Sequence, residues 1–244
     1  MKKLKPDKLN YRISGEGKSA ILFLHGWGGS MSSFEFFENN LSQYQLVINL
    51  DLYGFGKSEI DYNNLCDIYT YALNIYLFLK ENKIENINIV AHSFGGRIAI
   101  LLASCFDIKI NKMVLTGCAG IKTKKNILTK CKILYYKIIK QIKNTFHINF
   151  ININKFGSFD YKQLSTDGKQ FFNKILSQDL TYSLKYINCE CILFWGKKDK
   201  STSIKTLKII KNKLKKSKLI IYKNSGHFCY MENKISFLNL LYNL

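Results

Sequence analysis

Residues 87–97 form the stretch INIVAHSFGGR, in which an apolar, β-branched run leads into a serine flanked by small residues. The run predicts a buried strand, and apolar side chains at helical spacing from Arg97 onward predict a helix. A sharp turn between strand and helix forces its central residue, Ser93, into a strained conformation that requires small residues at positions 91 and 95. Ala91 and Gly95 meet that requirement. We therefore expect the turn to raise the Ser93 hydroxyl above the sheet edge, beside backbone N–H groups that open the helix.

The alternation of short apolar strands and amphipathic helices extends along most of the chain. Strands are predicted at residues 9–14, 20–25, 46–52, 87–93, 112–117, 190–195 and 218–223, and helices at 33–41, 67–82, 95–106, 203–215 and 234–242. Such alternation is typical of β-α-β units around a parallel sheet. The sequence therefore predicts an α/β fold with a doubly wound, mostly parallel sheet, and 244 residues suit a single domain, 1–244.

Between residues 119 and 187 the alternation breaks, and two amphipathic helices are predicted near 128–144 and 168–180. A segment inserted after a sheet strand projects from the strand ends, where open α/β sheets bind ligands. We expect a core of residues 1–118 and 188–244 with a helical cap or lid at about 119–187. The first cap helix is basic, so two hypotheses stand: its apolar face covers the site, or it rests on an anionic membrane surface.

A serine nucleophile requires a histidine base, and the chain has four histidines. His92 lies inside the turn and must point away from Ser93, His25 ends a predicted strand, and His147 falls in the insertion. His227 remains, in a loop after the last predicted strand. It is the predicted base.

The base requires an acid that orients it. Asp199 directly follows the predicted strand that ends at Trp195, on the sheet edge that also carries the serine turn. Its alternative interpretation is a surface turn residue. The sequence thus predicts a triad of Ser93, His227 and Asp199.

Together these motifs resemble the α/β-hydrolase superfamily, in particular small bacterial cytosolic members with a short helical cap, and the order Ser, Asp, His along the chain is the one expected there. Residues 25–29, HGWGG, are similar to the family's H-G-x-x-G oxyanion loop, and residues 51–58, DLYGFGKS, to its structural D-x-x-G-x-G-x-S segment. The resemblance implies that the backbone N–H groups of Trp27 and Phe94 form an oxyanion hole. Two departures are Ala91, where glycine is usual, and Tyr53, where proline is frequent.

The expected activity is that of a serine hydrolase, which cleaves a carboxylic ester or thioester of a small, partly hydrophobic substrate through an acyl-enzyme, without metal or organic cofactor. Trp27 either lines the substrate pocket or packs internally. Arg97 either binds a substrate carboxylate or is an exposed helix residue. The first possibility for Arg97 keeps open an alternative function on a C–C bond, or as a lyase, with a carboxylated substrate. A further alternative is a non-catalytic ligand-binding protein.

The composition bears on partners and location. A net charge of +20 comes mostly from lysines spread along a chain rich in Asn, Ile and Tyr, which favours a solvated surface, so no nucleic-acid partner is expected. Seven irregularly spaced cysteines indicate a reducing cytosol, and none of the spacings is that of a zinc site. The N-terminal residues lack the apolar core of a secretory signal, and no apolar run spans a bilayer. We expect a cytoplasmic protein; the sequence does not indicate its oligomeric state.

Overall fold

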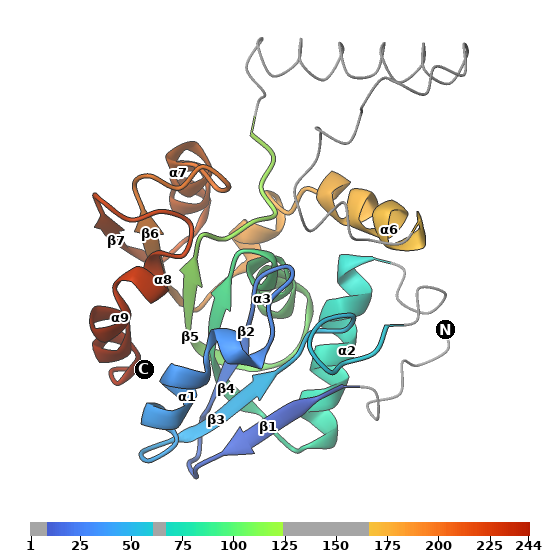
Figure 1. Cartoon of the computed structure of the whole chain (residues 1–244), viewed down its shortest axis with the longest axis vertical. Coiled ribbons are helices and arrows are strands. Elements are labelled where there is room, and N and C mark those ends of the chain that lie inside the picture. Colours follow the sequence, from blue (N-terminus) through green and yellow to red (C-terminus); the bar gives the residue numbers. More distant parts are fainter. Residues whose placement is uncertain (1–8, 61–66, 124–165) are drawn as a thin grey trace, which may run out of the picture.

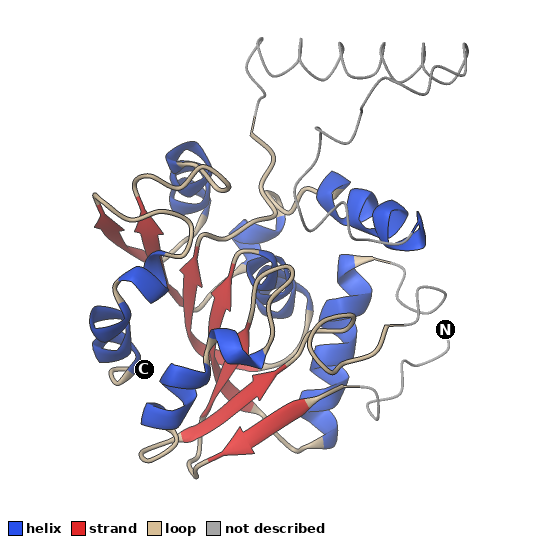
Figure 2. Cartoon of the chain, viewed as in Figure 1, coloured by secondary structure: helices blue, strands red, loops and turns tan. Residues whose placement is uncertain are grey.

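The computed structural model describes residues 9–60, 67–123 and 166–244, which build a seven-stranded sheet between two layers of helices (Figures 1 and 2). The strands are β1 (Tyr11–Ser14), β2 (Ala20–Leu24), β3 (Leu46–Leu50), β4 (Asn86–His92), β5 (Lys109–Thr116), β6 (Glu190–Gly196) and β7 (Ser217–Tyr222). The α-helices are α1 (Glu35–Leu41), α2 (Ile68–Glu81), α3 (Phe94–Cys105), α6 (Thr166–Ser177), α7 (Ile204–Lys213), α8 (Cys229–Glu232) and α9 (Lys234–Leu241). Two 3-10 helices, η2 (Met31–Ser33) and η4 (Ser183–Tyr186), lie in the connections.

The strand order is β1-β3-β2-β4-β5-β6-β7, and every neighbouring pair is parallel except β1 with β3. The prediction of an α/β fold with a mostly parallel sheet is confirmed. Predicted strands and helices recur with their ends shifted by at most three residues. Because β4, β6 and β7 run in the same direction, their carboxyl ends meet at one edge of the sheet.

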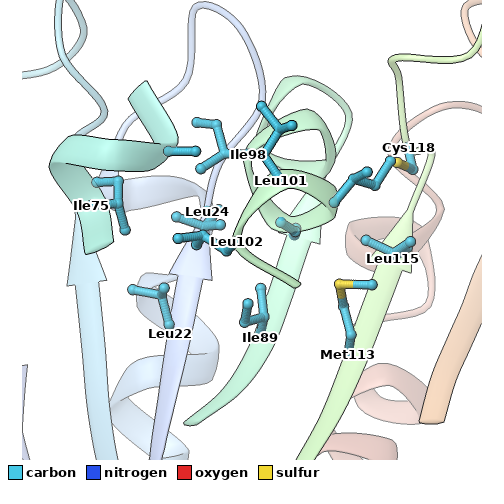
Figure 3. Close-up of a cluster of buried hydrophobic side chains, with 14 of the residues drawn as sticks. Leu22, Leu24, Ile75, Ile89, Ile98, Leu101, Leu102, Met113, Leu115 and Cys118 are labelled. Carbon is cyan, nitrogen blue, oxygen red and sulfur yellow. The ribbon is translucent and has the colours of Figure 1, made fainter. Parts of the chain in front are cut away.

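The central strands are buried on both faces, as their continuous apolar sequences require. In β2, Leu22 and Leu24 point to the layer of α2, α3 and α7, whereas Ile21 and Phe23 point to the layer of α1, α8 and α9. Figure 3 shows part of the first layer, where Ile98 and Leu102 of α3 pack over the sheet. This packing holds the start of α3 against the strand ends.

The predicted insertion is described only at its two ends. The helix expected near 128–144 lies outside the described residues, whereas the helix expected near 168–180 is α6. The division into core and cap therefore stays a prediction. None of the helices in the described ranges combines the length and apolar character needed to cross a bilayer.

Candidate active site

The turn between β4 and α3 has the strained geometry that its sequence predicts. Ser93 has φ 49° and ψ −106°, a conformation that side-chain-bearing residues rarely adopt. The Ser93 N–H donates to the carbonyl of Thr116 at 3.0 Å, and its own carbonyl accepts from the N–H groups of Gly96 at 3.1 Å and Ala119 at 3.0 Å. The bonds to Thr116 and Ala119 tie the serine to the end of β5 and to the residues that follow it.

Gly95 is required by close approach of the backbone. A Cβ atom at this position would lie 2.2 Å from the carbonyl oxygen of Leu24, at the end of β2. The Gly95 N–H also donates to the carbonyl of His25 at 3.0 Å, which joins the serine turn to the loop after β2. Ala91 is buried in β4, and its methyl group belongs to the core.

Ser93, His227 and Asp199 form one hydrogen-bonded chain. The Ser93 Oγ atom lies 3.0 Å from His227 Nε2, and His227 Nδ1 lies 2.8 Å from Asp199 Oδ2. The three residues come from the turns after β4, β7 and β6, so the shared strand direction brings them together. The carboxylate of Asp199 has no exposed surface and the His227 side chain is 17% exposed, so only the histidine and serine face the solvent side.

The Asp199 carboxylate is held by more than the histidine. Its Oδ1 atom accepts from the N–H groups of Ser201 and Thr202, each at 2.8 Å, and its Oδ2 atom accepts from Thr202 Oγ1 at 2.7 Å. Burial by itself would raise the pKa of Asp199, but the hydrogen bonds from His227 and Thr202 outweigh it and hold this pKa below its ordinary value. Asp199 is therefore an ionised carboxylate at neutral pH.

His25 is a structural histidine, as expected. Its Nδ1 atom lies 2.7 Å from the Gly26 carbonyl, and its Nε2 atom accepts from the Leu52 N–H at 2.9 Å. An Nε2 atom that accepts must leave the proton on Nδ1, which then donates to Gly26. Burial lowers the pKa of His25, so the ring is neutral and fixes the shape of residues 25–29.

His92 points away from Ser93, behind the triad. Its Nδ1 atom lies 3.1 Å from the Thr116 carbonyl, and its ring centre is 4.7 Å from that of His227. Burial, with a smaller contribution from His227, lowers the pKa of His92 to about 3. The His92 ring therefore packs against His227 as a neutral group. The fourth histidine, His147, lies outside the described residues.

The backbone N–H groups of Trp27 and Phe94 have no acceptor among the described residues. Phe94 is the first residue of α3, where N–H groups lack intrahelical partners. The bond from Gly95 to His25 holds the two loops together beside Ser93. Both groups are thus free to donate to an anion.

The segment 51–58 supports this loop structurally, as its resemblance implies. Asp51 accepts from the N–H groups of Met31 at 2.7 Å and Lys57 at 2.8 Å, and Ser58 Oγ donates to the Asp51 carbonyl at 2.6 Å. These bonds tie the end of β3 to the residues that follow the loop at 25–29.

Aromatic rings surround Trp27, which is partly buried. Its ring centre lies 4.9 Å from that of Phe55, 5.1 Å from that of Phe94 and 4.5 Å from that of Phe172, all edge to face. Phe172 belongs to α6, so α6 packs directly on the loop after β2. The internal packing of Trp27 is observed, and its role as a pocket wall stays a prediction.

Arg97 corrects one expectation. It is only 5% exposed, so the interpretation as a surface helix residue is wrong. Its Nη1 atom donates to the carbonyls of Ile175 and Gln178, each at 3.0 Å. The C-terminal end of α6 covers the first turn of α3, a contact across some 80 residues that a local pattern does not reveal. This geometry gives the carboxylate-binding hypothesis no support.

No cluster of three His, Cys, Asp or Glu side chains suited to a metal ion occurs within the described ranges. The residues that sequence reasoning missed are Thr202, which holds Asp199, and Phe172, which contacts Trp27. A threonine three residues after an aspartate is a signal for side-chain to backbone turns and could have indicated the first. Nothing local indicates the second.

Comparison with known proteins finds the same fold. Residues 19–130 match a family model described as alpha/beta hydrolase fold. The chain is 26% identical over 250 aligned positions to AB hydrolase superfamily protein YisY of Bacillus subtilis, covering 90% of this chain and 88% of that protein. It is 25% identical to Lipase 3 of Moraxella sp. over 91% of this chain and 75% of the lipase. An esterase from Exiguobacterium antarcticum superposes with a TM-score of 0.74 at 21% identity, covering 96% of this chain and 94% of the esterase.

Proposed function

We propose that this chain, which has the α/β-hydrolase fold and matches that family's model over residues 19–130, is a serine hydrolase that cleaves carboxylic esters or thioesters through an acyl-enzyme on Ser93. The observation that carries the proposal is the hydrogen-bonded chain from Ser93 Oγ through His227 to the buried Asp199 carboxylate. An isolated serine hydroxyl is a poor nucleophile, and a histidine oriented by a carboxylate is the arrangement that activates it.

In the proposed reaction His227 Nε2 takes the Ser93 proton as Oγ attacks the substrate carbonyl. The N–H groups of Trp27 and Phe94 donate to the developing oxyanion. His227 then returns the proton to the leaving group, and water, activated by the same histidine, hydrolyses the acyl-enzyme. Asp199 stays ionised and stabilises the imidazolium, in keeping with its lowered pKa.

The similar proteins and the surroundings of Ser93 indicate the substrate class. Two of the similar proteins are named as a lipase and an esterase, which favours ester bonds. The rings of Trp27 and Phe172 beside the proposed oxyanion donors favour a partly hydrophobic acyl group. Because Arg97 is engaged by backbone carbonyls, the structure offers no specific reason to prefer a C–C bond or a carboxylated substrate.

The test is labelling with a fluorophosphonate, which reacts covalently with activated serines. We expect the wild type to label and Ser93→Ala to be unlabelled and to lose kcat toward simple esters by about 10⁴-fold or more. Ser201→Ala is the matched control, because this exposed serine is close to Asp199 but outside the triad, and it should label as the wild type does. Absence of labelling in folded wild type, or full labelling of Ser93→Ala, would refute the proposal and favour a non-catalytic ligand-binding protein.

A further inference from the structure

Arg97 is a buried cation that the proposed mechanism does not use. It lies four residues after Ser93, in the first turn of α3, and no carboxylate in the described part of the chain accepts a hydrogen bond from it. Its Nη1 atom instead donates to the carbonyls of Ile175 and Gln178, at the C-terminal end of α6. The last carbonyls of a helix lack intrahelical donors and carry the negative end of the helix dipole. A guanidinium at this position supplies both N–H donors and a positive charge.

Other contacts gather at the same junction. The Leu180 N–H donates to the Gly120 carbonyl at 2.8 Å, and the Lys122 N–H donates to Asp179 Oδ1 at 3.3 Å. These bonds join the segment that follows β5 to the segment that follows α6. A Cβ atom at Gly120 would lie 3.1 Å from Arg97 Cγ, so the stem of the arginine packs against this junction. Arg97 thus connects the helix that follows Ser93 to both described ends of the insertion.

On its other contacts with the core, α6 uses aromatic side chains. On α6, the ring of Phe172 lies 4.5 Å from that of Trp27, and the ring of Phe171 stacks at 5.9 Å on that of Tyr71. Tyr71 in turn lies 5.3 Å from Phe94. Trp27 and Phe94 are the proposed oxyanion residues. The placement of α6 therefore decides which apolar surface stands next to the carbonyl that Ser93 attacks.

We infer that Arg97 is a positioning residue for substrate specificity: by anchoring the C-terminal end of α6 it holds Phe172 against Trp27 and so sets the preference for the acyl chain. The inference rests on the proposed function and concerns the same site. Arg97 touches no reacting atom and acts only through α6. Its removal should therefore weaken the binding of acyl chains long enough to reach Phe172, while the chemistry on a short acyl group continues.

The experiment compares 4-nitrophenyl acetate with 4-nitrophenyl octanoate for the wild type, Arg97→Met, Arg97→Lys and Phe172→Ala. For Arg97→Met we expect KM for the octanoate to rise about tenfold, the factor that corresponds to a loss of roughly 1.4 kcal/mol of binding, with kcat on the acetate within about twofold of the wild type. Arg97→Lys keeps a cation near the carbonyls and should recover part of the loss. Arg12→Met, which removes a half-exposed arginine from the distant β1 edge, is the control and should leave the preference unchanged.

A double-mutant cycle separates action through α6 from general destabilisation. If Arg97 acts through Phe172, the KM of the double variant for the octanoate will equal that of Phe172→Ala, because the second change removes nothing further. Multiplicative effects, or equal losses on both esters, would overturn the inference. Should Arg97→Met fail to fold in a thermal melt, the same cycle with Arg97→Lys decides.

Fluorophosphonate labelling distinguishes the two possible failures. Wild type that neither labels nor hydrolyses either ester refutes the proposed function, and the inference with it. Active wild type whose acyl preference is the same in Arg97→Met and Arg97→Lys refutes the inference alone.

Discussion

Thr202 donates its hydroxyl hydrogen bond to Asp199 Oδ2 at 2.7 Å, the same carboxylate oxygen that lies 2.8 Å from His227 Nδ1. Its backbone N–H donates to the other oxygen, Oδ1, at 2.8 Å. The Trp195 indole N–H in turn donates to the Thr202 carbonyl at 2.8 Å, so the threonine is fixed from the core of β6. Thr202 thus determines how the carboxylate faces the histidine.

Replacement of Thr202 by valine tests this role, because it removes the hydroxyl and keeps both the shape and the backbone N–H. Hydrogen bonds to charged groups contribute roughly 1.5–3 kcal/mol, and part of that will be recovered by the remaining donors, so we expect kcat to fall about tenfold with KM unchanged. Loss of a donor to the carboxylate should also raise the pKa of Asp199.

The matched control for Thr202→Val is Thr206→Val. Thr206 is a buried threonine of α7 that makes no hydrogen bond to Asp199 or His227. Steady-state kinetics on one ester should show the kcat loss in the first variant only. Equal losses in both variants would mean that packing of this region, not the bond to Asp199, is responsible.

The elements and the proximity of Ser93, His227 and Asp199 could be predicted because their signals are local. A strand followed by a tight turn and a helix is encoded in a dozen consecutive residues around Ser93, and parallel strands place their following loops at one edge without any knowledge of packing. Once that edge is assumed, elimination among the histidines leads to His227, and the loop after residue 195 supplies Asp199. The structure brings these three side chains within hydrogen-bond distance.

The contacts of α6 could not be predicted in this way. Arg97 lies among apolar residues of α3. The hydrophobic periodicity of this helix does not indicate that Arg97 contacts carbonyls 78 and 81 residues away in the sequence. The contact of Phe172 with Trp27 likewise depends on where α6 lies relative to the loop after β2. Burial of a charged residue by a distant helix is a tertiary property, whereas hydrophobic periodicity reports only which face of an element is apolar.

His92 supplies a prediction about stability and pH. In the folded protein its pKa is about 3, because burial disfavours the charged ring, whereas an unfolded histidine titrates near its ordinary value of about 6.5. Between these values the unfolded chain binds a proton that the folded chain does not, so stability falls as the pH drops through this window. At about pH 5 the loss from His92 amounts to about 2 kcal/mol.

We expect His92→Phe to unfold with a free energy that changes less between pH 7 and pH 5 than that of the wild type, measured by urea denaturation at both pH values. Phenylalanine suits the site because His92 already packs among the rings of Phe228 and Tyr230. A residual slope should persist, since burial also lowers the pKa of His25. Phe228→Leu changes the same packing without a titrating group and should keep the full wild-type slope; the same slope in His92→Phe would contradict this assignment.

Substitutions at Gly95 and Ala91, the two small positions of the serine turn, should lower stability by very different amounts. In Gly95→Ala the new Cβ atom would lie 2.2 Å from the Leu24 carbonyl oxygen and 2.8 Å from that of His25, and both are backbone atoms that cannot move without disturbing β2 and residues 25–29. We expect the free energy of unfolding to fall by about 3 kcal/mol or more, or the variant to fail to fold.

Ala91→Gly restores the usual motif. Because Ala91 is a buried strand residue, this change should lower the free energy of unfolding by only about 1 kcal/mol and keep fluorophosphonate labelling. Urea denaturation of both variants decides, and a Gly95→Ala protein as stable as Ala91→Gly would show that the turn is less tightly packed than its geometry indicates.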